Sequence, residues 1–339
     1  MSKLGETVAQ KHGAGGSAMR TLIEKVFVAG LGPAGAGLAA MDDGAAIPVG
    51  DGFLVLTTDS YVIKPLFFPG GDIGRLAICG TINDLAMMGA TEPLGLTCAV
   101  IIEAGFAIAD LERIRDSMRA ACVEAGATIV TGDTKVMGKG ELDGIVVNTA
   151  GVAFAKRVVR DSGLRTGDRI IVTGSVGDHG LAVMAARHKL QLQGELVSDV
   201  APLNGLVRAA QAAGGEFISA MKDPTRGGLS SALHEMAANG KVGIVLDEAC
   251  VPVRPEVRAA SELLGIDPLH VANEGKAVIG VRADATDRVL QVLRAHPLGR
   301  DAAIIGGCVA ERPGSVILDT GFGRRLLAEP EGELLPRIC

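Results

Sequence analysis

The residues that set the fold of the first half of the chain are Asp42-Asp43-Gly44-Ala45-Ala46 and, further on, Phe53-Leu54-Val55-Leu56-Thr57-Thr58-Asp59. The apolar run over 53–58 predicts a strand that ends at Asp59. Working outward, a proline- and glycine-rich loop leads to a helix predicted over 73–88. The next predicted elements are a strand over 94–102, a helix over 109–125, and strands over 128–131 and 144–153. This order has no repeated crossover, so we expect an α+β domain with helices over one sheet face.

The second half of the chain alternates short apolar strands with helices. Strands are predicted over 169–173, 216–221, 243–246, 276–281 and 302–309, and helices over 180–188, 203–213, 227–239, 256–264 and 285–296. This alternation indicates an α/β domain with a mixed sheet. We therefore divide the chain into an N-terminal domain over 1–155, a C-terminal domain over 156–325 and a flexible tail over 326–339.

Acidic residues recur where apolar segments end: Asp42 and Asp43, Asp59, Asp84, and Asp133. Carboxylates that share one cleft repel each other unless a cation neutralises them, and Mg²⁺ binds one or two carboxylates together with phosphate oxygens and water. Any one of these aspartates, taken alone, is better explained as a helix cap or a turn former. As a set, beside the lysine of Gly132-Asp133-Thr134-Lys135, they favour a metal–triphosphate site.

Several glycine-rich segments resemble phosphate-binding loops. Gly30-Leu31-Gly32-Pro33-Ala34-Gly35 matches the GxGxxG pattern, but residues 19–27 before it have helical spacing, so we reject a dinucleotide-binding fold. The segment 174–180 follows a strand and opens a helix, and we interpret it as a structural turn. His12-Gly13-Ala14-Gly15-Gly16 could equally wrap a phosphate or form a mobile leader.

Two polar stretches interrupt the second half. Residues 222–228 lead from a strand to a helix and place Arg226 at the helix N-terminus, where a phosphate could bind. Asn273-Glu274-Gly275-Lys276 places a carboxylate just before an apolar strand. Each stretch, by itself, is explained as well by loop structure as by an active site.

The composition limits the classes of function. A chain of 339 residues with 48% hydrophobic residues can bury a large core, and its 47 glycines and 3% aromatic residues indicate many tight turns. No segment approaches the roughly 20 uncharged apolar residues of a membrane span, and the N-terminus has no signal-peptide core. A net charge of −6 argues against nucleic acid as a partner. We expect a cytoplasmic protein.

The six cysteines form no CxxC pair and no metal-ligand spacing with histidine, so a zinc site is not expected. Five of them (Cys79, Cys98, Cys122, Cys250 and Cys308) lie in apolar contexts, and we interpret them as inert core residues. The sixth, Cys339, is the last residue of Leu335-Pro336-Arg337-Ile338-Cys339. Its proline predicts a short arm that stands off the body and carries a thiol into another site. The alternative is a frayed end with an accidental cysteine.

One resemblance covers nearly the whole chain, from about residue 12 to residue 339. It rests on Thr57-Thr58-Asp59-Ser60-Tyr61-Val62, Phe68-Pro69-Gly70-Gly71-Asp72-Ile73-Gly74, Gly80-Thr81-Ile82-Asn83-Asp84-Leu85-Ala86, Val130-Thr131-Gly132-Asp133-Thr134-Lys135-Val136, Asp223-Pro224-Thr225-Arg226-Gly227-Gly228, Ala272-Asn273-Glu274-Gly275-Lys276 and the terminal Leu335-Pro336-Arg337-Ile338-Cys339. With these motifs the chain resembles the HypE family of hydrogenase maturation proteins. That family is part of the superfamily of AIR synthase, thiamine-monophosphate kinase and selenophosphate synthetase.

The resemblance implies an activity and its partners. The terminal Cys339 would receive a carbamoyl group from HypF, and ATP would phosphorylate the amide oxygen. Loss of phosphate would leave a thiocyanate, whose cyanide passes to iron held by HypC–HypD during assembly of a [NiFe]-hydrogenase centre. The resemblance also implies an AIR synthase-like fold and a homodimer whose N-terminal sheets pair into a barrel.

The resemblance also assigns residues. Lys135 would stabilise negative charge on the amide oxygen or phosphate, and Glu274 would be the general base. The residues that would bind Mg–ATP are Asp42, Asp43, Asp59, Asp84, Asp133, Asp223 and Arg226, with Asp43, Asp59, Asp84 and Asp223 nearest the metal.

Two other classes of function stay open on the sequence. A kinase of the same superfamily that acts on a free small molecule would not need Cys339. A nucleotide-switched scaffold would use the tail only to dock partners. ATP hydrolysis that requires a carbamoylated tail would separate the dehydratase from both.

Overall fold

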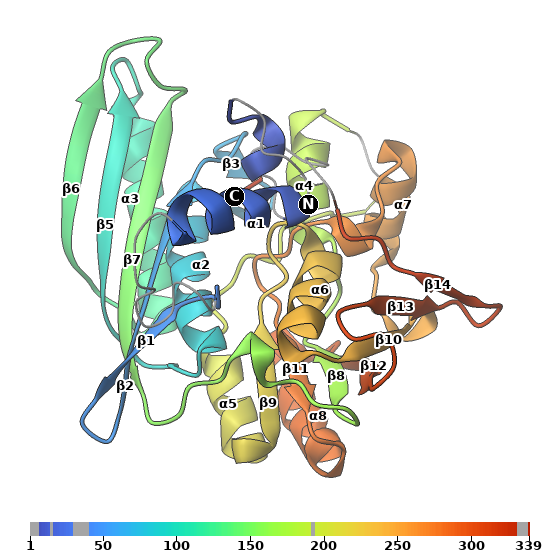
Figure 1. Ribbon diagram of the computed structural model, residues 1–339. Coiled ribbons are helices and arrows are strands. Elements are labelled where there is room, and N and C mark those ends of the chain that lie inside the picture. The colour runs from blue at the N-terminus through green and yellow to red at the C-terminus, as the bar shows by residue number, and fades with distance from the viewer. Residues whose placement is uncertain (1–6, 14–15, 30–40, 191–193, 331–337) are drawn as a thin grey trace.

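Helix α2 (Ile73–Met87) lies between the two large β-sheets of the protein (Figure 1). The computed structural model describes residues 7–13, 16–29, 41–190, 194–330 and 338–339. Asp72 caps the helix, because its Oδ1 accepts hydrogen bonds from the backbone N–H groups of Gly74 at 2.7 Å and Arg75 at 3.1 Å. Thirteen of the 15 helix residues are buried. The helix is therefore apolar on all sides because it is packed on all sides.

The first sheet has five strands in the order β1-β2-β7-β5-β6. They are β1 (Ala45–Val49), β2 (Gly52–Tyr61), β7 (Ile145–Ala155), β5 (Pro93–Glu103) and β6 (Ile129–Met137). All neighbouring pairs are antiparallel except β5 and β6, which are parallel because helix α3 (Ile108–Ala125) connects them. A short hairpin, β3 (Phe67–Phe68) with β4 (Gly71–Asp72), precedes α2.

Only one face of this sheet is covered by helices of the described chain. Every second residue of β7, from Ile145 to Ala155, is buried toward α2, whereas the residues between them are partly or fully exposed. On β6 even the apolar side chains of Val130 and Val136 are exposed, at 64% and 69%. The first sheet therefore presents an open face and an open edge strand, visible at the left of Figure 1.

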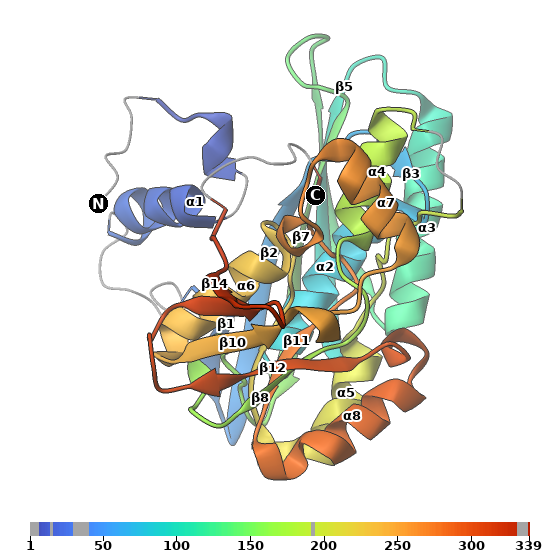
Figure 2. The ribbon, with the colours of Figure 1, turned by 90° about the vertical axis from the view of Figure 1, so that its right-hand side faces the viewer.

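The second sheet has seven strands in the order β14-β13-β10-β12-β8-β11-β9. Their bounds are β8 (Arg169–Val172), β9 (Ile218–Lys222), β10 (Gly243–Asp247), β11 (Val278–Val281), β12 (Ala303–Val309), β13 (Val316–Asp319) and β14 (Arg324–Leu326). The helices of this half are α4 (Asp178–Arg187), α5 (Asn204–Gly214), α6 (Gly228–Gly240), α7 (Pro255–Leu264) and α8 (Thr286–Ala295). Alternate residues of β8 enter different cores: Ile171 packs with the α5 and α8 side chains, and Ile170 and Val172 pack with those of α6. Figure 2 shows α5 and α8 together below the sheet.

Asn83 joins α2 to loops of the second half. Its Nδ2 donates to the carbonyl oxygens of Ala201 and Glu274, each at 3.2 Å, and its Oδ1 accepts from the N–H of Leu203 at 2.8 Å. The side chain is 1% exposed. Next to it along the helix, Ala86 and Met87 pack into the apolar cluster around α5 and α8. Helix α2 thus carries both the polar and the apolar contacts that hold the two halves together.

The two-domain α+β and α/β architecture predicted from the sequence is confirmed, and every predicted helix and strand is present. The first sheet ends at Ala155 and the second begins at Arg169, while the domain boundaries themselves stay predictions. Residues 19–27 are helical as expected, in α1 (Gly16–Leu22) and the π-helix η2 (Ile23–Val28). The GxGxxG motif over 30–35 lies outside the described residues. No helix in the described part of the chain is long and apolar enough to cross a membrane.

Three expectations were wrong in detail. Strands β1, β13 and β14 were missed because they are short, with 5, 4 and 3 residues; β1 and β14 also lie at sheet edges. The strand predicted over 128–131 does not end at residue 131, because residues 132–135 continue it as the middle of β6. A Cβ on Gly132 would lie 2.1 Å from the carbonyl oxygen of Cys98, so this glycine permits close strand contact. Of the five cysteines taken as core residues, Cys250 is exposed and Cys98 only partly buried. Cys250 follows strand β10 at its exposed end.

We predict that Asn83→Ala destabilises the protein by about 3 kcal/mol, because the N–H of Leu203 and the carbonyl oxygen of Ala201 lose the Asn83 side chain. The carbonyl oxygen of Glu274 keeps only a 3.4 Å hydrogen bond from the N–H of Ala201. Denaturant unfolding followed by circular dichroism measures this change. Asn148→Ala is the control, since Asn148 also makes several hydrogen bonds but is partly exposed on the open sheet face, and we expect a loss below about 1 kcal/mol. Equal losses in the two variants would contradict the role given to Asn83.

Candidate active site

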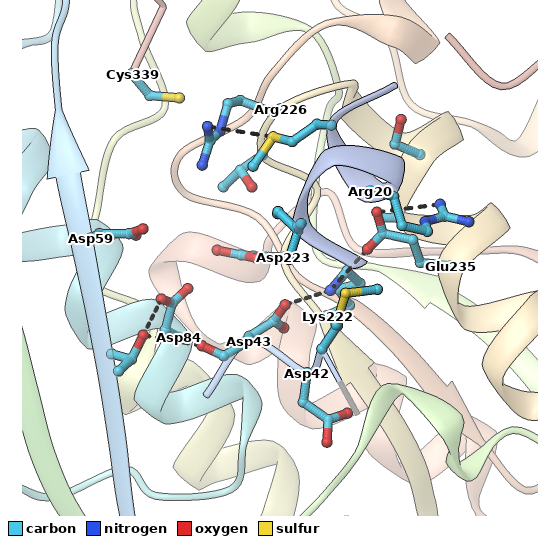
Figure 3. A pocket seen from close by; sticks show the side chains of 18 of the residues that line it. Arg20, Asp42, Asp43, Asp59, Asp84, Lys222, Asp223, Arg226, Glu235 and Cys339 are labelled. Carbon is cyan, nitrogen blue, oxygen red and sulfur yellow. Dashed lines mark hydrogen bonds and ion pairs between the residues drawn. The ribbon is translucent and has the colours of Figure 1, made fainter. Parts of the chain in front are cut away.

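A cleft of about 520 Å³ opens between strand β2 and helix α2 of the first half and the β9–α6 connection of the second half. Helix α1 borders it (Figure 3). The side chains that line it include most of the predicted site residues: Asp42, Asp43, Asp59, Asp84, Asp223, Arg226, Glu274 and Cys339. These residues come from positions up to 297 residues apart in the sequence (339 minus 42), and only the packing of the two halves brings them together.

Four of the aspartates carry perturbed carboxyl groups. Burial raises the pKa of Asp84 well above its usual range, and the charges of Asp59, Asp223 and Asp43 raise it further. Burial likewise raises the pKa of Asp223 well above the usual range, and the pKa values of Asp43 and Asp59 are also raised by burial. Each of these groups disfavours the charge of the others. The cleft therefore holds a set of carboxylates that a cation would stabilise.

Hydrogen bonds from neighbouring hydroxyl groups orient two of these carboxylates. The hydroxyl of Thr57 donates to Asp84 Oδ2 at 2.7 Å, and the hydroxyl of Tyr61 donates to Asp59 Oδ2 at 3.1 Å. Tyr61 can reach this place because α2 has a glycine beside it: a Cβ on Gly80 would lie 2.1 Å from the Tyr61 hydroxyl oxygen. The motif around Gly80 thus makes room for a residue that orients a site carboxylate.

Lys222 is a site residue that was noted in the sequence but given no role. Its buried Nζ lies 2.5 Å from Asp43 Oδ1, 3.2 Å from Glu235 Oε2 and 3.9 Å from Asp161 Oδ2. Although burial lowers the pKa of Lys222, these three carboxylates raise it well above its usual range. Lys222 therefore stays charged and offsets part of the negative charge of the cleft. The sequence carried no local signal for this role, because the burial of Lys222 at the end of β9 and its three acidic partners come from the tertiary structure.

Asp42 has a different partner from its neighbour Asp43. Its carboxylate forms an ion pair with Arg160 and accepts a hydrogen bond from the N–H of Asp161 at 3.3 Å. Its side chain is 1% exposed. Asp42 thus lies at the wall of the cleft and ties the start of β1 to the segment that links the two sheets.

Glu274 is the most isolated carboxyl group of the site. It is 3% exposed, and its Oε1 has no hydrogen-bond partner among the described residues. Burial raises its pKa well above the usual range, and the charges of Asp223, Asp199 and Asp59 add to the effect. A buried carboxyl with a free oxygen and a raised pKa is suited to accept a proton near neutral pH.

The last two residues of the chain lie in its own cleft. Ile338 is 4% exposed, and the half-buried Cys339 lines the cleft with Glu274, Arg226 and Asp59. Burial and the charge of Glu274 raise the pKa of the Cys339 thiol, whereas Arg226 opposes them. The expectation of a free-standing arm is therefore wrong for these two residues, because the apolar side chain of Ile338 enters a core. Residues 335–337 lie outside the described residues.

Asp133 and Lys135 do not lie in the cleft of this chain. They form an exposed ion pair on β6, with Lys135 Nζ 2.8 Å from Asp133 Oδ2 and side chains 67% and 60% exposed. Within one chain the structure therefore does not unite them with the other predicted site residues. Their roles stay predictions.

The glycine-rich N-terminal segment reaches the cleft at Arg226. Gly13 ends a short 3-10 helix (Gln10–Gly13), and its carbonyl oxygen accepts a hydrogen bond from Arg226 at 3.5 Å. Arg20 of α1 pairs with Glu329 at 2.6 Å and with Glu235 at 3.6 Å. Residues 14 and 15 lie outside the described part, so the predicted phosphate contact of this segment stays untested.

The donor set suits a magnesium ion that is shared with a nucleotide. Among the described residues, no three His, Cys, Asp or Glu side chains are arranged as a ready metal site. The four raised-pKa aspartates nevertheless supply the oxygen ligands that Mg²⁺ prefers, and Mg²⁺ takes only one or two of them when phosphate oxygens are present. The residues Asp43, Asp59, Asp84 and Asp223 therefore fit a Mg–triphosphate and not a stand-alone metal centre.

Comparison with known proteins follows the same division of the chain. The sequence profile of the AIR synthase related protein, N-terminal domain, matches residues 41–155, and that of its C-terminal domain matches residues 165–319. The carbamoyl dehydratase HypE of Rhizobium leguminosarum bv. viciae is 50% identical over 331 residues, which cover 97% of this chain and 94% of that protein.

Solved structures agree with this. The HypE–HypF complex contains a chain with a TM-score of 0.86 and 44% identity, covering 91% of this chain and 99% of that one. A HypE structure in complex with ATP has a TM-score of 0.82 and 39% identity, covering 98% of this chain and 100% of that one. On these similarities, the chain belongs to the HypE family of AIR synthase related proteins.

Proposed function

We propose that this protein is an ATP-dependent carbamoyl dehydratase of [NiFe]-hydrogenase maturation, which converts a carboxamide on Cys339 to a thiocyanate. The observation that carries this proposal is the position of Cys339 in the cleft, beside the buried carboxyl group of Glu274, whose Oε1 has no hydrogen-bond partner among the described residues. The relatives named carbamoyl dehydratase and the HypE structure in complex with ATP support the same activity and the same second substrate.

The first chemical step joins the carboxamide oxygen on Cys339 to the γ-phosphorus of ATP. The bond from that phosphorus to the bridging oxygen breaks, ADP leaves, and one of the two nitrogen protons is released as the C=N bond forms. Arg226, at the N-terminal end of α6, is placed to hold phosphate oxygens, since its side chain lines the cleft above Asp223 (Figure 3).

The second step expels phosphate. Glu274 accepts the remaining nitrogen proton, the C–O bond breaks and the nitrile forms on the sulfur. Burial and the charge of Asp223 raise the pKa of Glu274, and a raised pKa makes its carboxylate a stronger proton acceptor. The wall around Glu274 is buried, which keeps water from competing for the carbon atom.

Asp43, Asp59, Asp84 and Asp223 would hold Mg²⁺ with the nucleotide. When bound, the ion neutralises the phosphate charge that these carboxylates would otherwise repel. Lys222 offsets part of the negative charge of the set through its ion pairs with Asp43 and Glu235. Asp42 would not contact the metal but would support the nucleotide site indirectly, through its ion pair with Arg160.

The proposed partners are HypF, as donor of the carbamoyl group, and the HypC–HypD complex, as carrier of the iron that accepts cyanide. The similarity to the HypE chain of the HypE–HypF complex supports the first. We also propose a homodimer. The open face of the first sheet and the exposed apolar residues of β6 support it, because a second copy of that sheet would cover both.

In such a dimer we propose that Lys135 and Asp133 act on the cleft of the second copy. The two residues are exposed on the edge strand and far from the described lining of their own cleft. This arrangement would bring a positive charge to the developing anion of the amide oxygen or phosphate.

Cys339→Ser should abolish both modified forms of the protein, because the serine hydroxyl is a much weaker nucleophile than the cysteine thiol and does not take up the carbamoyl group. The measurement is intact-protein mass spectrometry after incubation with HypF, carbamoyl phosphate and ATP. ATP binding should be unchanged. Cys308→Ser, which alters a buried cysteine of the second half, should still show the carbamoyl adduct and then the loss of one water. An adduct that persists in Cys339→Ser would disprove the proposed attachment.

Glu274→Gln should lower the rate of dehydration by about 10²- to 10⁴-fold while ATP still binds. The substitution should also stabilise the folded protein relative to the parent, and this gain should grow as the pH rises. The carboxyl group of Glu274 has a raised pKa in the folded state, so the unfolded chain ionises first and the folded protein loses stability from about pH 5 upward. Glutamine cannot ionise, so the gain in Tm of Glu274→Gln over the parent should be larger at pH 8 than at pH 5. The exposed Glu262→Gln should show no such pH-dependent gain.

Lys135→Ala and Cys339→Ser, each inactive alone, should complement each other when the two variants are unfolded together and refolded as a mixture. If Lys135 acts across the dimer, a mixed dimer has one complete site, so random pairing restores about one quarter of the parental activity. Dehydration is followed by the same mass measurement on the Cys339-bearing chain. A mixture as inactive as its components would place Lys135 in the site of its own chain, or outside catalysis.

A further inference from the structure

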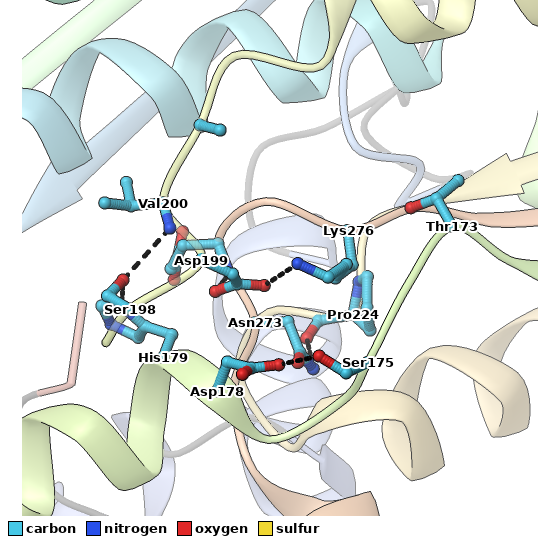
Figure 4. A network of polar contacts seen from close by, with 12 residues as sticks. Thr173, Ser175, Asp178, His179, Ser198, Asp199, Val200, Pro224, Asn273 and Lys276 are labelled. Carbon is cyan, nitrogen blue, oxygen red and sulfur yellow. Dashed lines mark hydrogen bonds and ion pairs between the residues drawn. The ribbon is translucent and has the colours of Figure 1, made fainter. Parts of the chain in front are cut away.

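His179 is a buried residue that the proposed chemistry does not use. It is 0% exposed, and both of its ring nitrogens have partners: Nε2 lies 2.9 Å from the carbonyl oxygen of Ile338, and Nδ1 lies 2.8 Å from Ser198 Oγ. Figure 4 shows His179 on α4, beside the loop that contains Ser198. The terminal segment and the interior of the second half are thus joined by one side chain.

The partners determine which nitrogen carries the proton. The carbonyl oxygen of Ile338 can only accept, so Nε2 must be the donor. Burial lowers the pKa of His179, so the ring is neutral and Nδ1 accepts the hydrogen bond from the Ser198 hydroxyl. Ser198 Oγ in turn accepts from the N–H of Val200 at 3.1 Å. If Ile338 leaves, the buried Nε2–H of His179 loses its hydrogen-bond acceptor.

The side chain of Ile338 has an apolar site of its own. It belongs to the buried cluster that contains Phe68, Val183 and Val200. The ring of His179 meets Phe68 edge-to-face, with centroids 5.4 Å apart and an interplanar angle of 88°. The same imidazole therefore forms one wall of the apolar site and donates to the backbone of the residue that fills it.

The segment that carries Ser198 also holds the proposed base. Asp199 Oδ1 accepts from the N–H of Glu274 at 3.0 Å, and its Oδ2 accepts from Lys276 Nζ at 3.0 Å. Gly275 fits tightly here, since a Cβ on it would lie 1.8 Å from the carbonyl oxygen of Asp199. Residues 198 and 199 thus fix the tail on one side and the backbone of Glu274 on the other.

We propose that His179, Ser198 and the apolar residues around them form a docking site for the penultimate residue, Ile338, and that His179 is the positioning residue which holds Cys339 at Glu274. This role of His179 in catalysis rests on the proposed function, because holding Cys339 at Glu274 matters only if Glu274 is the base for dehydration. Fixing the residue next to the modified cysteine reduces the conformations that the thiocarboxamide can adopt, which raises the fraction with its nitrogen near the base.

Docking also has a cost for the preceding step. In the docked state the thiol is half-buried in a negative cleft, so a partner enzyme cannot reach it. Carbamoylation therefore requires the Ile338 contacts to break, and dehydration requires them to form. Weakening the site should slow dehydration while leaving carbamoylation as fast as before or faster.

The test is the rate at which iodoacetamide alkylates Cys339 at pH 8, read by mass spectrometry of the C-terminal peptide. Alkylation needs no carbamoyl group and no ATP, so it reports docking even if the proposed reaction proved wrong. His179→Phe keeps the ring against Phe68 but cannot donate, and we expect about tenfold faster alkylation, the size of a lost hydrogen bond. Ile338→Asp should give a larger increase, and it does not alter the body of the protein. His179→Gln, whose amide can donate, should lie closer to the parent.

The matched control is His296→Phe, at the end of α8 and outside the cleft, which should leave the alkylation rate unchanged. The second readout is the split between the two half-reactions: in Ile338→Ala we expect slower dehydration of the pre-carbamoylated protein, unchanged ATP affinity and undiminished carbamoylation. Parental alkylation rates in both His179→Phe and Ile338→Asp would overturn the docking site. Faster alkylation in a protein that shows no dehydration at all would uphold the docking site and reject the proposed function.

Discussion

The three hydrogen bonds of Asn83 are the contact on which the rest of the structure depends. They attach the last turns of α2 to the backbone at residues 201, 203 and 274, which belong to the other half of the chain. Asp84 follows Asn83 on the helix, and Glu274 contributes its carbonyl oxygen to Asn83 and its carboxyl group to the cleft. One buried amide thus sets the distance between a nucleotide-side carboxylate and the proposed base.

The cleft concentrates negative charge that the fold by itself does not favour. Burial raises the pKa values of Asp84, Asp223 and Glu274 well above their usual ranges. Lys222 offsets part of this charge, through its ion pairs with Asp43 and Glu235 and through its attraction to Asp223. Such a site loses stability until a cation and its nucleotide arrive. Strain of this kind is common where binding and catalysis need carboxylates in a dry environment.

The tail adds a second requirement, because the same cysteine must be accessible to one enzyme and enclosed for the next reaction. Ile338 is held by only two kinds of contact, its buried apolar side chain and one hydrogen bond from His179 to its carbonyl oxygen. Such a small set of contacts can form and break, as the two steps require. Contacts of this strength hold a segment most of the time but still let it leave. The segment 174–180, which looked like a plain turn in sequence, supplies this histidine directly after Asp178.

The sequence by itself determined the order of helices and strands, the two-domain architecture, the family and most of the cleft residues, because apolar periodicity and the motifs around Asp59, Asp84, Asp223 and Glu274 are local in the chain. It did not reveal the role of Lys222 or His179, and it ended the strand of residues 128–131 too early, because burial and strand pairing depend on residues far away along the chain. Only the tertiary structure decided that Lys135 and Asp133 lie outside the cleft of their own chain, on an exposed edge strand. It also decided that Ile338 is buried, since a terminal residue has no pattern of neighbours that could predict a partner 159 positions earlier.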